Sequence, residues 1–581
     1  MTETAQRPGM TAGLLADIGE DYVRVGVMAP SEGRQRLVLD SRAGANGADP
    51  TAGLGEALRT LERLSGWCMV DRSAAPPLVA AVATLTLPTV LIAGTVDGLR
   101  ALRERAAQLP DLDVSLELIL DTRGRAPSGA GAAARALDGC TLEVILASLR
   151  SRQEAELLSA LLRAVRIKTP AGRALLLFSG PTEVATTLNN DLTSAAQLIT
   201  AGTVDWGHSG FDLAAARTAV AERVRQRLEP LRARTGTRGP LETRPTALEA
   251  AACTLQTTAQ ANTCLLDLGG PETHIVVAHD QALERRNGGD QSVLTGHTRL
   301  GTGEGFSRVL DAISPSALLR WLPFDLPPEG LMDYLGNRAL RREPRAGDVQ
   351  GLLIDQAVAR ECAIATRNPQ WTVVPELVAV TGPAAAYPRF GQTALVLLDA
   401  LQPAGPCRLL ADASGILARV GALAPHDTQA GLSLLKSDTL VDLGPCLSLM
   451  GRATDGETVG EIEVEILSVE GTAERTTFDV RFGSLMLIPL RPGQVSSLRV
   501  TTSRRVSFRL QESDGYWARG QVDGGEEGDG QTVEGGILGL VVDARGRPMV
   551  LSADDLIRQA HLMEWLQVMD AVDAEVLSGL D

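Results

Sequence analysis

A strand–turn–strand pattern occurs twice in this chain, and this repeat constrains the fold more than any other feature of the sequence. The first copy covers residues 12–28 and contains LLADIGEDYVRVGVM, and the second covers residues 263–279, TCLLDLGGPETHIVVAH. In both copies an apolar strand runs into an Asp-x-Gly turn, at Asp17 and at Asp267, and a β-branched strand follows. A repeated supersecondary unit predicts a fold with two related halves.

Helical and strand patterns alternate along most of the chain, which is typical of the α/β class. Helical patterns lie at 50–66, 151–166 and 212–231, and strand patterns lie at 78–87, 113–120, 173–179 and 377–380. From about residue 450, short strands such as EIEVEILSV and RVSFRL alternate with turns, which indicates an antiparallel β domain. We therefore expect an N-terminal lobe with insertions over 1–240, a second lobe over 241–449, a β domain over 450–552 and a closing helical segment over 553–581.

Composition limits the classes of partner and compartment. Hydrophobic residues make up 44% of the 581 residues and charged residues 22%, so the chain can bury a core. The formal net charge of −16 argues against a nucleic-acid partner. No apolar run is long enough for a membrane span, and the amino terminus, MTETAQRPGM, does not have the pattern of a secretory signal. The seven cysteines are scattered without a C-x-x-C pair, which favours reduced thiols, so we expect a cytoplasmic protein.

The two Asp-x-Gly turns have the chemistry of a phosphate site. Glycines let phosphate oxygens approach the main chain, whose N–H groups form a concavity for anions. A carboxylate at the same turn holds Mg²⁺, usually through water. A third turn, Thr381-Gly382-Pro383, would approach the base and ribose of a nucleotide. The candidate residues are Asp17 and Gly19 in the first turn, and Asp267, Gly269, Gly270 and Thr273 in the second.

The order of these three turns resembles the two phosphate motifs and the adenosine motif of the actin/Hsp70/sugar-kinase superfamily. The chain resembles the glutamate mutase L family more narrowly, in segments such as SALLRWLPFDLPPEGLMDYLGNRALR, DQAVARECAIATRN and GGILGLVVDARGRPMVL. The resemblance implies an actin-like ATPase fold of two duplicated RNase H-like lobes, with an additional C-terminal antiparallel β domain. It also implies an ATP-driven, chaperone-like accessory of a cobalamin-dependent mutase, in which Asp17 and Asp267 position Mg²⁺ and the attacking water.

Three departures from the family pattern leave a second function open. Glu20 and Asp21 stand where relatives carry hydroxyl residues, and His274 stands where an acidic residue is common. Pro383 replaces the second glycine of the adenosine motif and removes a backbone donor. The ATP site is therefore partly degenerate. The alternative is a non-catalytic pseudo-ATPase scaffold that mediates protein–protein assembly, including a homo-oligomer; a sugar or metabolite kinase is a third option, without a separate acidic base to support it.

Other motifs are interpreted as structural. The six histidines show no metal-ligand spacing, and we interpret His274 and His279 as surface imidazoles. The GTGEG segment at 301–305 is either a helix-start loop or an anion site at a helix amino terminus. The aromatic segment 321–324 is typical of core packing, with a partner-facing anchor as the alternative. The segment 543–548, DARGRP, indicates a turn with paired charges.

Overall fold

The computed structural model divides into two compact units. Unit 1 comprises Met1–Ala29 and Leu37–Ala247, and unit 2 comprises Pro30–Arg36 and Leu248–Asp581. The structure describes residues 12–573 and 575, apart from 20–21, 46–49, 68–75, 85–88, 107–108, 110–111, 121–141, 165–173, 193–195, 201–212, 280–292, 304, 341–345, 369–370, 372, 468–472 and 511–530. Within these ranges no helix has the length and apolarity that a membrane crossing needs. The domain limits given above remain predictions.

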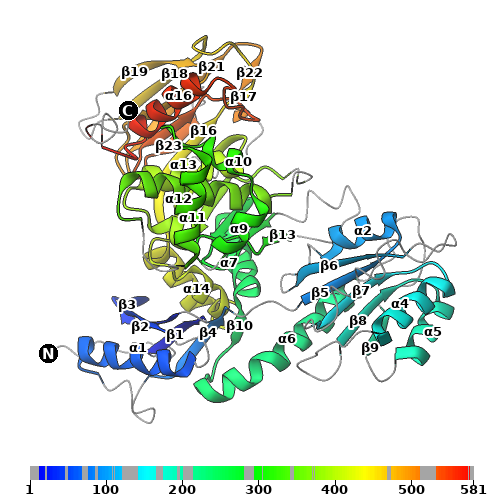
Figure 1. The fold of residues 1–581 in the computed structure, drawn as a ribbon. Coiled ribbons are helices and arrows are strands. Elements are labelled where there is room, and N and C mark those ends of the chain that lie inside the picture. The colour runs from blue at the N-terminus through cyan, green and yellow to red at the C-terminus, as the bar shows by residue number, and fades with distance from the viewer. Residues whose placement is uncertain are drawn as a thin grey trace. The chain divides into compact units, whose positions relative to one another are not determined.

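Unit 1 contains a five-stranded mixed sheet with the order β10-β4-β1-β2-β3 (Figure 1). Strand β1 is antiparallel to β2 and parallel to β4, and β4 is parallel to β10. Every residue of β1, GLLADI, is buried, as expected for a central strand covered on both faces. The elements are β1 (Gly13–Ile18), β2 (Tyr22–Ser31), β3 (Arg34–Gly44), β4 (Leu78–Ala83), β10 (Leu241–Thr243), α1 (Pro50–Ser65) and α6 (Leu213–Thr235), and α7 (Arg244–Ala259) begins in unit 1 and continues into unit 2.

A second sheet is inserted between β4 and β10, and all its pairings are parallel, in the order β6-β5-β7-β8-β9. Apolar side chains of α2 and α6 pack on one face of it and those of α4 and α5 on the other, which makes it a doubly wound sheet. The insertions expected in this lobe therefore form a separate sheet with its own covering helices. Three of its strands, β5, β7 and β9, were not predicted from the sequence. The elements are β5 (Thr89–Gly94), β6 (Asp113–Ile119), β7 (Val144–Ser148), β8 (Ala174–Ser179), β9 (Ala196–Thr200), α2 (Val96–Ala106), α4 (Arg152–Ala164) and α5 (Thr182–Leu192).

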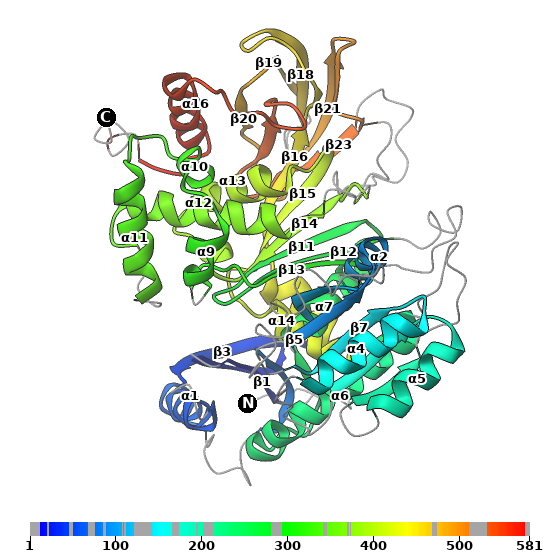
Figure 2. The same ribbon diagram turned by 45° about the vertical axis from the view of Figure 1, so that its right-hand side comes forward.

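Unit 2 contains an eight-stranded sheet with the order β13-β12-β11-β14-β15-β16-β24-β20 (Figure 2). Strand β11 is antiparallel to β12 and parallel to β14, and β14 is parallel to β15. The strands are β11 (Thr263–Leu268), β12 (Thr273–Ala278), β13 (Val293–Thr298), β14 (Leu377–Thr381), β15 (Gly405–Ala411), β16 (Val441–Ser448), β20 (Leu485–Ile488) and β24 (Leu540–Asp543).

The first five strands of unit 2 repeat the strand order of the first sheet of unit 1. In both sheets the first strand is central, the second and third follow on one side, and the fourth and fifth lie on the other. In both, the first strand is antiparallel to the second and parallel to the fourth. This repeated 3-2-1-4-5 order confirms the predicted α/β fold of two duplicated RNase H-like lobes, which is the actin-like ATPase fold.

Helix α12 is the central helix of unit 2. Most of its residues are buried because it packs against β11 and β12 as well as α13 (Figure 2). Asp348 caps it by accepting a hydrogen bond from the Gly351 amide at 2.7 Å. The helices of this unit are α9 (Phe306–Ala312), α10 (Pro315–Leu319), α11 (Pro328–Leu340), α12 (Val349–Thr366), η1 (Pro383–Ala386), α13 (Phe390–Leu401), α14 (Leu417–Leu423), α15 (Thr428–Leu434), η2 (Leu435–Thr439) and α16 (Asp555–Val568).

The predicted C-terminal antiparallel sheet is present, with the order β19-β18-β21-β23. The C-terminal segment is not confined to this sheet, because β20 and β24 extend the large sheet beyond β16. The remaining strands are β17 (Met450–Gly451), β18 (Thr458–Leu467), β19 (Ala473–Arg481), β21 (Val495–Thr502), β22 (Val506–Ser507) and β23 (Gln531–Glu534).

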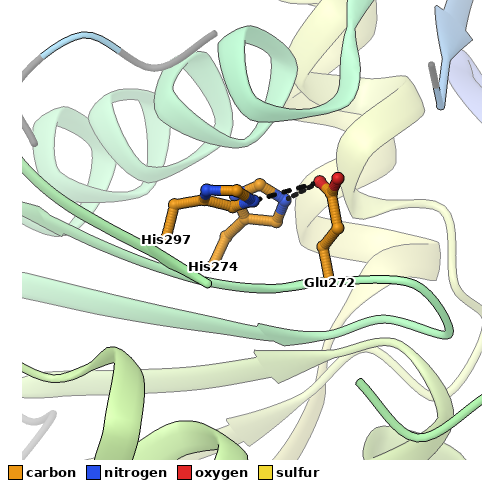
Figure 3. Close-up of side chains that lie close together, drawn as sticks. All are labelled: Glu272, His274 and His297. Carbon is orange, nitrogen blue, oxygen red and sulfur yellow. Dashed lines mark ion pairs between the residues drawn. The ribbon is translucent and has the colours of Figure 1, made fainter. Parts of the chain in front are cut away.

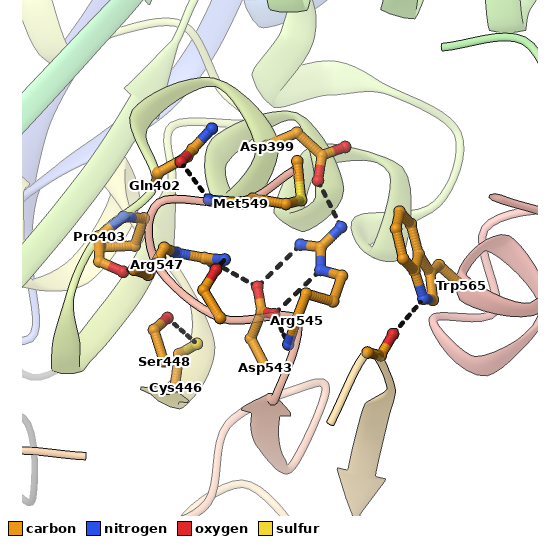
Figure 4. Close-up of polar contacts among 12 residues, drawn as sticks. Asp399, Gln402, Pro403, Cys446, Ser448, Asp543, Arg545, Arg547, Met549 and Trp565 are labelled. Atoms are coloured by element: carbon orange, nitrogen blue, oxygen red, sulfur yellow. Dashed lines mark hydrogen bonds and ion pairs between the residues drawn. The ribbon is translucent and has the colours of Figure 1, made fainter. Parts of the chain in front are cut away.

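A buried ion network joins the C-terminal segment to the helices of unit 2 (Figure 4). Asp543, at the end of β24, accepts hydrogen bonds from Arg545 at 2.8 and 2.9 Å and from Arg547. Arg545 also donates to Asp399 of α13 at 2.7 Å, and Asp399 accepts from Arg360 of α12 at 2.6 Å. All five side chains are at most 5% exposed. The paired charges predicted for the 543–548 turn therefore have a structural role, because they hold the C-terminal segment against α12 and α13.

Candidate functional site

The carboxyl ends of the parallel strands in unit 2 gather three polar side chains. Asp267 is the second-to-last residue of β11 and Thr381 is the last residue of β14, and the two residues are paired in register. Asp412 follows β15 and accepts the Thr381 hydroxyl at 2.8 Å and the amides of Ile416 and Leu417 at 3.1 and 2.9 Å. Burial raises the pKa of Asp412, against the lowering effect of these hydrogen bonds. The sequence analysis missed Asp412, although it also follows an apolar strand.

Gly382 brings the main chain against the Asp267 carboxylate. Its φ is +84°, in the left-handed region, and a Cβ there would lie 2.4 Å from the Leu268 carbonyl oxygen and 3.1 Å from Asp267 Oδ1. Only glycine fits this position without strain. The structure therefore brings together Asp267, Thr381 and Gly382, which the sequence analysis had assigned to two separate motifs.

The equivalent strand ends in unit 1 gather a different set of side chains. Asp17 is the second-to-last residue of β1, Thr84 follows β4, and Arg244 follows β10. Asp17 accepts the Thr84 hydroxyl at 3.3 Å and Arg244 Nη1 at 2.9 Å. The Asp17 and Arg244 side chains are 5% and 12% exposed. In register, Val82 of β4 lies beside Asp17 as Thr381 lies beside Asp267, so Thr84 and Arg244 lie two residues beyond the positions that match Thr381 and Asp412.

The ion pair with Arg244 changes the chemistry of the first motif. A carboxylate that is ion-paired with a largely buried guanidinium has to exchange that cation to ligate Mg²⁺ directly. Asp17 is therefore a poorer direct ligand for Mg²⁺ than its position alone indicates. Arg244 in turn has the donor geometry that suits a phosphate group.

The two predicted phosphate turns are each closed by the same kind of backbone hydrogen bond. The Gly19 amide donates to the Tyr22 carbonyl at 2.9 Å, and the Gly269 amide donates to the Glu272 carbonyl at 2.9 Å. Each amide closes its own turn, and both turns therefore have the same construction. Residues 20 and 21, the acidic pair that departs from the family pattern, lie outside the described residues.

The 301–305 loop packs on the second phosphate turn. The amides of Gly303 and Gly305 both donate to the Gly270 carbonyl at 2.9 Å, and the Thr302 amide donates to the Gly269 carbonyl at 3.0 Å. A Cβ on Gly301 would lie 2.4 Å from the Gly270 carbonyl oxygen. Helix α9 begins directly after this loop, so the segment is a helix-start loop that also holds the Gly269-Gly270 turn in place.

The Thr273 side chain points into the core. Its hydroxyl donates to the Leu300 carbonyl at 2.7 Å, and the residue has no exposed surface. Its assignment as a hydroxyl donor to a nucleotide remains a prediction. The aromatic segment is also buried, with Trp321 at 5% and Phe324 at 7% exposure, in agreement with the interpretation as core packing.

The interpretation of His274 and His279 as surface imidazoles is wrong. Both residues are 4% exposed, because both strands of the hairpin lie inside the sheet. His274 is paired in register with Asp267 on one side and with His297 on the other. Directly opposed residues of neighbouring strands share a face of the sheet, so these three side chains form a row. Sequence reasoning missed Glu272 and His297, although the Glu-x-His alternation was a usable signal.

Comparisons with known proteins give only weak structural likenesses. No protein-family model and no curated protein sequence matches this chain. Among solved structures, a nucleotide-free acetone carboxylase is 11% identical with a TM-score of 0.29, each chain being covered to 81%. Component A of the (R)-2-hydroxyglutaryl-CoA dehydratase of Acidaminococcus fermentans is 10% identical, with a TM-score of 0.26 and coverage of 72% of this chain and 99% of that one.

Xylulose kinase from Rhodospirillum rubrum is 14% identical, with a TM-score of 0.28 and coverage of 73% of this chain and 92% of that one. All three TM-scores lie below 0.5. The fold assignment therefore rests on the repeated strand order rather than on these likenesses.

Proposed function

We propose that this chain binds Mg·ATP and serves as an accessory protein of another enzyme. The proposal rests on the strand order that the two sheets share. The first strand of each sheet carries an aspartate at its second-to-last position, Asp17 in unit 1 and Asp267 in unit 2. In the superfamily that the chain resembles, the residues at these positions act on a bound nucleotide. The finer proposal, from the resemblance to the glutamate mutase L family, is that the partner is a cobalamin-dependent mutase.

The residues at the end of β11 fit a hydrated Mg²⁺ ion. Asp267 offers carboxylate oxygens, which Mg²⁺ prefers, and Thr381 and Gly382 lie beside it. In the proposal, Asp267 holds the ion through water and Gly269 and Gly270 face the phosphates, and Asp17 and Gly19 are the corresponding residues of unit 1. Thr381 and Gly382 lie toward the base and ribose.

A pseudo-ATPase scaffold is the second candidate, and a specific observation favours it. The Arg244 guanidinium forms an ion pair with the Asp17 carboxylate, which would otherwise help to place Mg²⁺ and the attacking water. In addition, the Thr273 hydroxyl is already bonded inside the core. Both features permit nucleotide binding and oppose rapid hydrolysis. The scaffold would bind a protein partner or a second copy of this chain.

Thermal unfolding in the presence of Mg·ATP tests the binding proposal. A ligand at 100 times its Kd stabilises the folded state by about 2.7 kcal/mol, so we expect millimolar Mg·ATP to raise the melting temperature and ATP with EDTA to raise it less. Asp267→Asn should remove the shift. Asp333→Asn is the matched control, because that carboxylate is exposed on α11. Native mass spectrometry of the purified chain gives an independent reading of bound nucleotide.

The outcomes separate the two candidates. A shift together with phosphate release that Asp267→Asn abolishes supports the ATPase. A shift without phosphate release supports a nucleotide-binding scaffold, and no shift at millimolar Mg·ATP rejects the nucleotide proposal.

The mutase partner requires its own experiment. An inactivated adenosylcobalamin mutase should recover activity when the full chain and Mg·ATP are added together, and the two proteins should co-elute. If neither recovery nor co-elution is observed, the mutase assignment fails while the nucleotide proposal is unaffected.

A further inference from the structure

Two histidines and a glutamate meet on one face of the unit 2 sheet, beside the second phosphate turn (Figure 3). Glu272 directly precedes β12, His274 lies on β12, and His297 lies on β13 as the register partner of His274. Side chains two residues apart along a strand project to the same face, and directly opposed residues do so as well. The strand register therefore determines that these three groups converge.

The distances within this cluster match those between ligands of one metal ion. Glu272 Oε2 lies 3.3 Å from His274 Nε2 and 3.2 Å from His297 Nε2. Charge-assisted N–H···O hydrogen bonds are shorter, about 2.7–2.9 Å. Ligands bound at about 2.0–2.1 Å to a tetrahedral zinc ion are separated by about 3.3–3.4 Å. One ligand atom from each residue lies within 4.8 Å of the other two.

The imidazole rings are oriented by packing as well as by the carboxylate. The two rings are stacked, with centroids 4.6 Å apart and an angle of 28° between their planes. Both Nε2 atoms therefore point toward the same Glu272 oxygen (Figure 3). Rings held in this way lose little freedom when they bind an ion, which favours affinity.

Burying the Glu272 carboxylate in this cluster costs free energy unless a positive charge lies beside it. Glu272 is 8% exposed and His274 4% exposed. A buried carboxylate needs a compensating positive charge or strong hydrogen bonds. A divalent cation bound between the three side chains would supply that charge.

We propose that Glu272, His274 and His297 bind one first-row divalent transition-metal ion of the zinc class. Imidazole ligands suit zinc and its neighbours in the first transition row, whereas Mg²⁺ prefers an all-oxygen set, so this site is distinct from the Mg²⁺ proposed at Asp267. Three protein ligands leave one tetrahedral position open for water or a substrate oxygen. The site lies in the strand row that contains Asp267, the register partner of His274. It goes beyond the proposed function and does not require it.

Metal titration of the full-length chain, purified without a polyhistidine tag, tests the proposal. After EDTA treatment and its removal, we expect one equivalent of Zn²⁺ to rebind and to raise the melting temperature. Co²⁺ should give the visible absorption bands of a tetrahedral site. Loss of an outer-shell partner typically weakens metal binding by about 10–100-fold. Glu272→Gln, His274→Asn and His297→Asn remove ligands themselves and should weaken it by about 100-fold or more.

A matched control separates this site from nonspecific binding. His426 is exposed, and His426→Asn should leave the affinity and the Co²⁺ spectrum unchanged. Circular dichroism of the metal-free variants establishes that they fold, and Glu272→Gln keeps the size of the side chain. The proposal is overturned if the chain binds no Zn²⁺ below about 10 μM, or if the three variants bind as tightly as the wild type. No nucleotide is present in this titration, so its failure and that of the Mg·ATP experiment are independent.

Discussion

Replacing Asp543 by Asn removes one charge from the buried ion network of unit 2 while keeping the size of the side chain. The Asp543 side chain has no exposed surface and accepts hydrogen bonds from both Arg545 and Arg547. In the wild type the network contains three guanidiniums and two carboxylates. Asp399 is the second carboxylate and Arg360 is the third guanidinium. In the variant Asp399 still pairs with Arg360 and Arg545, whereas Arg547 loses the carboxylate that it pairs with in the wild type.

The expected loss of stability follows from this burial. Removing one partner of a buried ion pair costs about 3–5 kcal/mol. We expect the lower end, about 3 kcal/mol, because Asn still offers one oxygen acceptor. Unit 2 has about 340 residues. An unfolding entropy of about 2.1 cal/mol/K per residue then gives about 0.7 kcal/mol/K, so its melting temperature should fall by about 4 °C.

Urea unfolding followed by tryptophan fluorescence measures this loss. The Trp565 ring lies 4.6 Å from the Arg545 guanidinium, so it reports on the network directly. Asp570→Asn is the control, since that carboxylate pairs with Arg389 at 2.6 Å but is 82% exposed, and surface pairs contribute about 0–1 kcal/mol. If Asp543→Asn loses no more stability than Asp570→Asn, the argument from burial is refuted.

Three further predictions use the same unfolding assay. Gly382→Ala should cost at least about 3 kcal/mol, because it forces a Cβ into the left-handed region and onto a carbonyl oxygen; Gly336→Ala, with open space around the added Cβ inside α11, should be neutral or stabilising. Arg244→Gln leaves the buried Asp17 carboxylate without its guanidinium and should cost unit 1 about 3 kcal/mol, and an unchanged urea midpoint would contradict this. The pKa of Asp543 is lowered in the folded state, since the charges and hydrogen bonds of its arginines outweigh burial. Its stabilisation is therefore complete above its unfolded pKa of about 3.9 and is lost as pH falls below that value, so Asp543→Asn should flatten the acid dependence of the urea midpoint.

The sequence by itself determined the two-lobed architecture and the main positions of the predicted site. The two Asp-x-Gly hairpins predicted a duplication because strand alternation and turn chemistry are local properties of the chain. The positions of Asp17 and Asp267 at the ends of buried strands followed from the same local pattern, and the strand register agrees with them. The closing helical segment, predicted over 553–581, was also readable from periodicity, and its helix is observed at Asp555–Val568.

The partners of these residues were decided only by the tertiary structure. Arg244 reaches Asp17 across 227 residues of sequence, because parallel strands that are distant in the chain end at the same edge of the sheet. Sequence reasoning also missed the doubly wound layer of unit 1, whose short apolar strands cannot be told from buried helix segments by periodicity.

The cluster of Glu272, His274 and His297 depends in the same way on the pairing of β12 with β13. A shift of that register by one residue would turn one set of side chains to the opposite face of the sheet. Such contacts are specified by the register and packing of whole elements, which no local pattern in the sequence encodes.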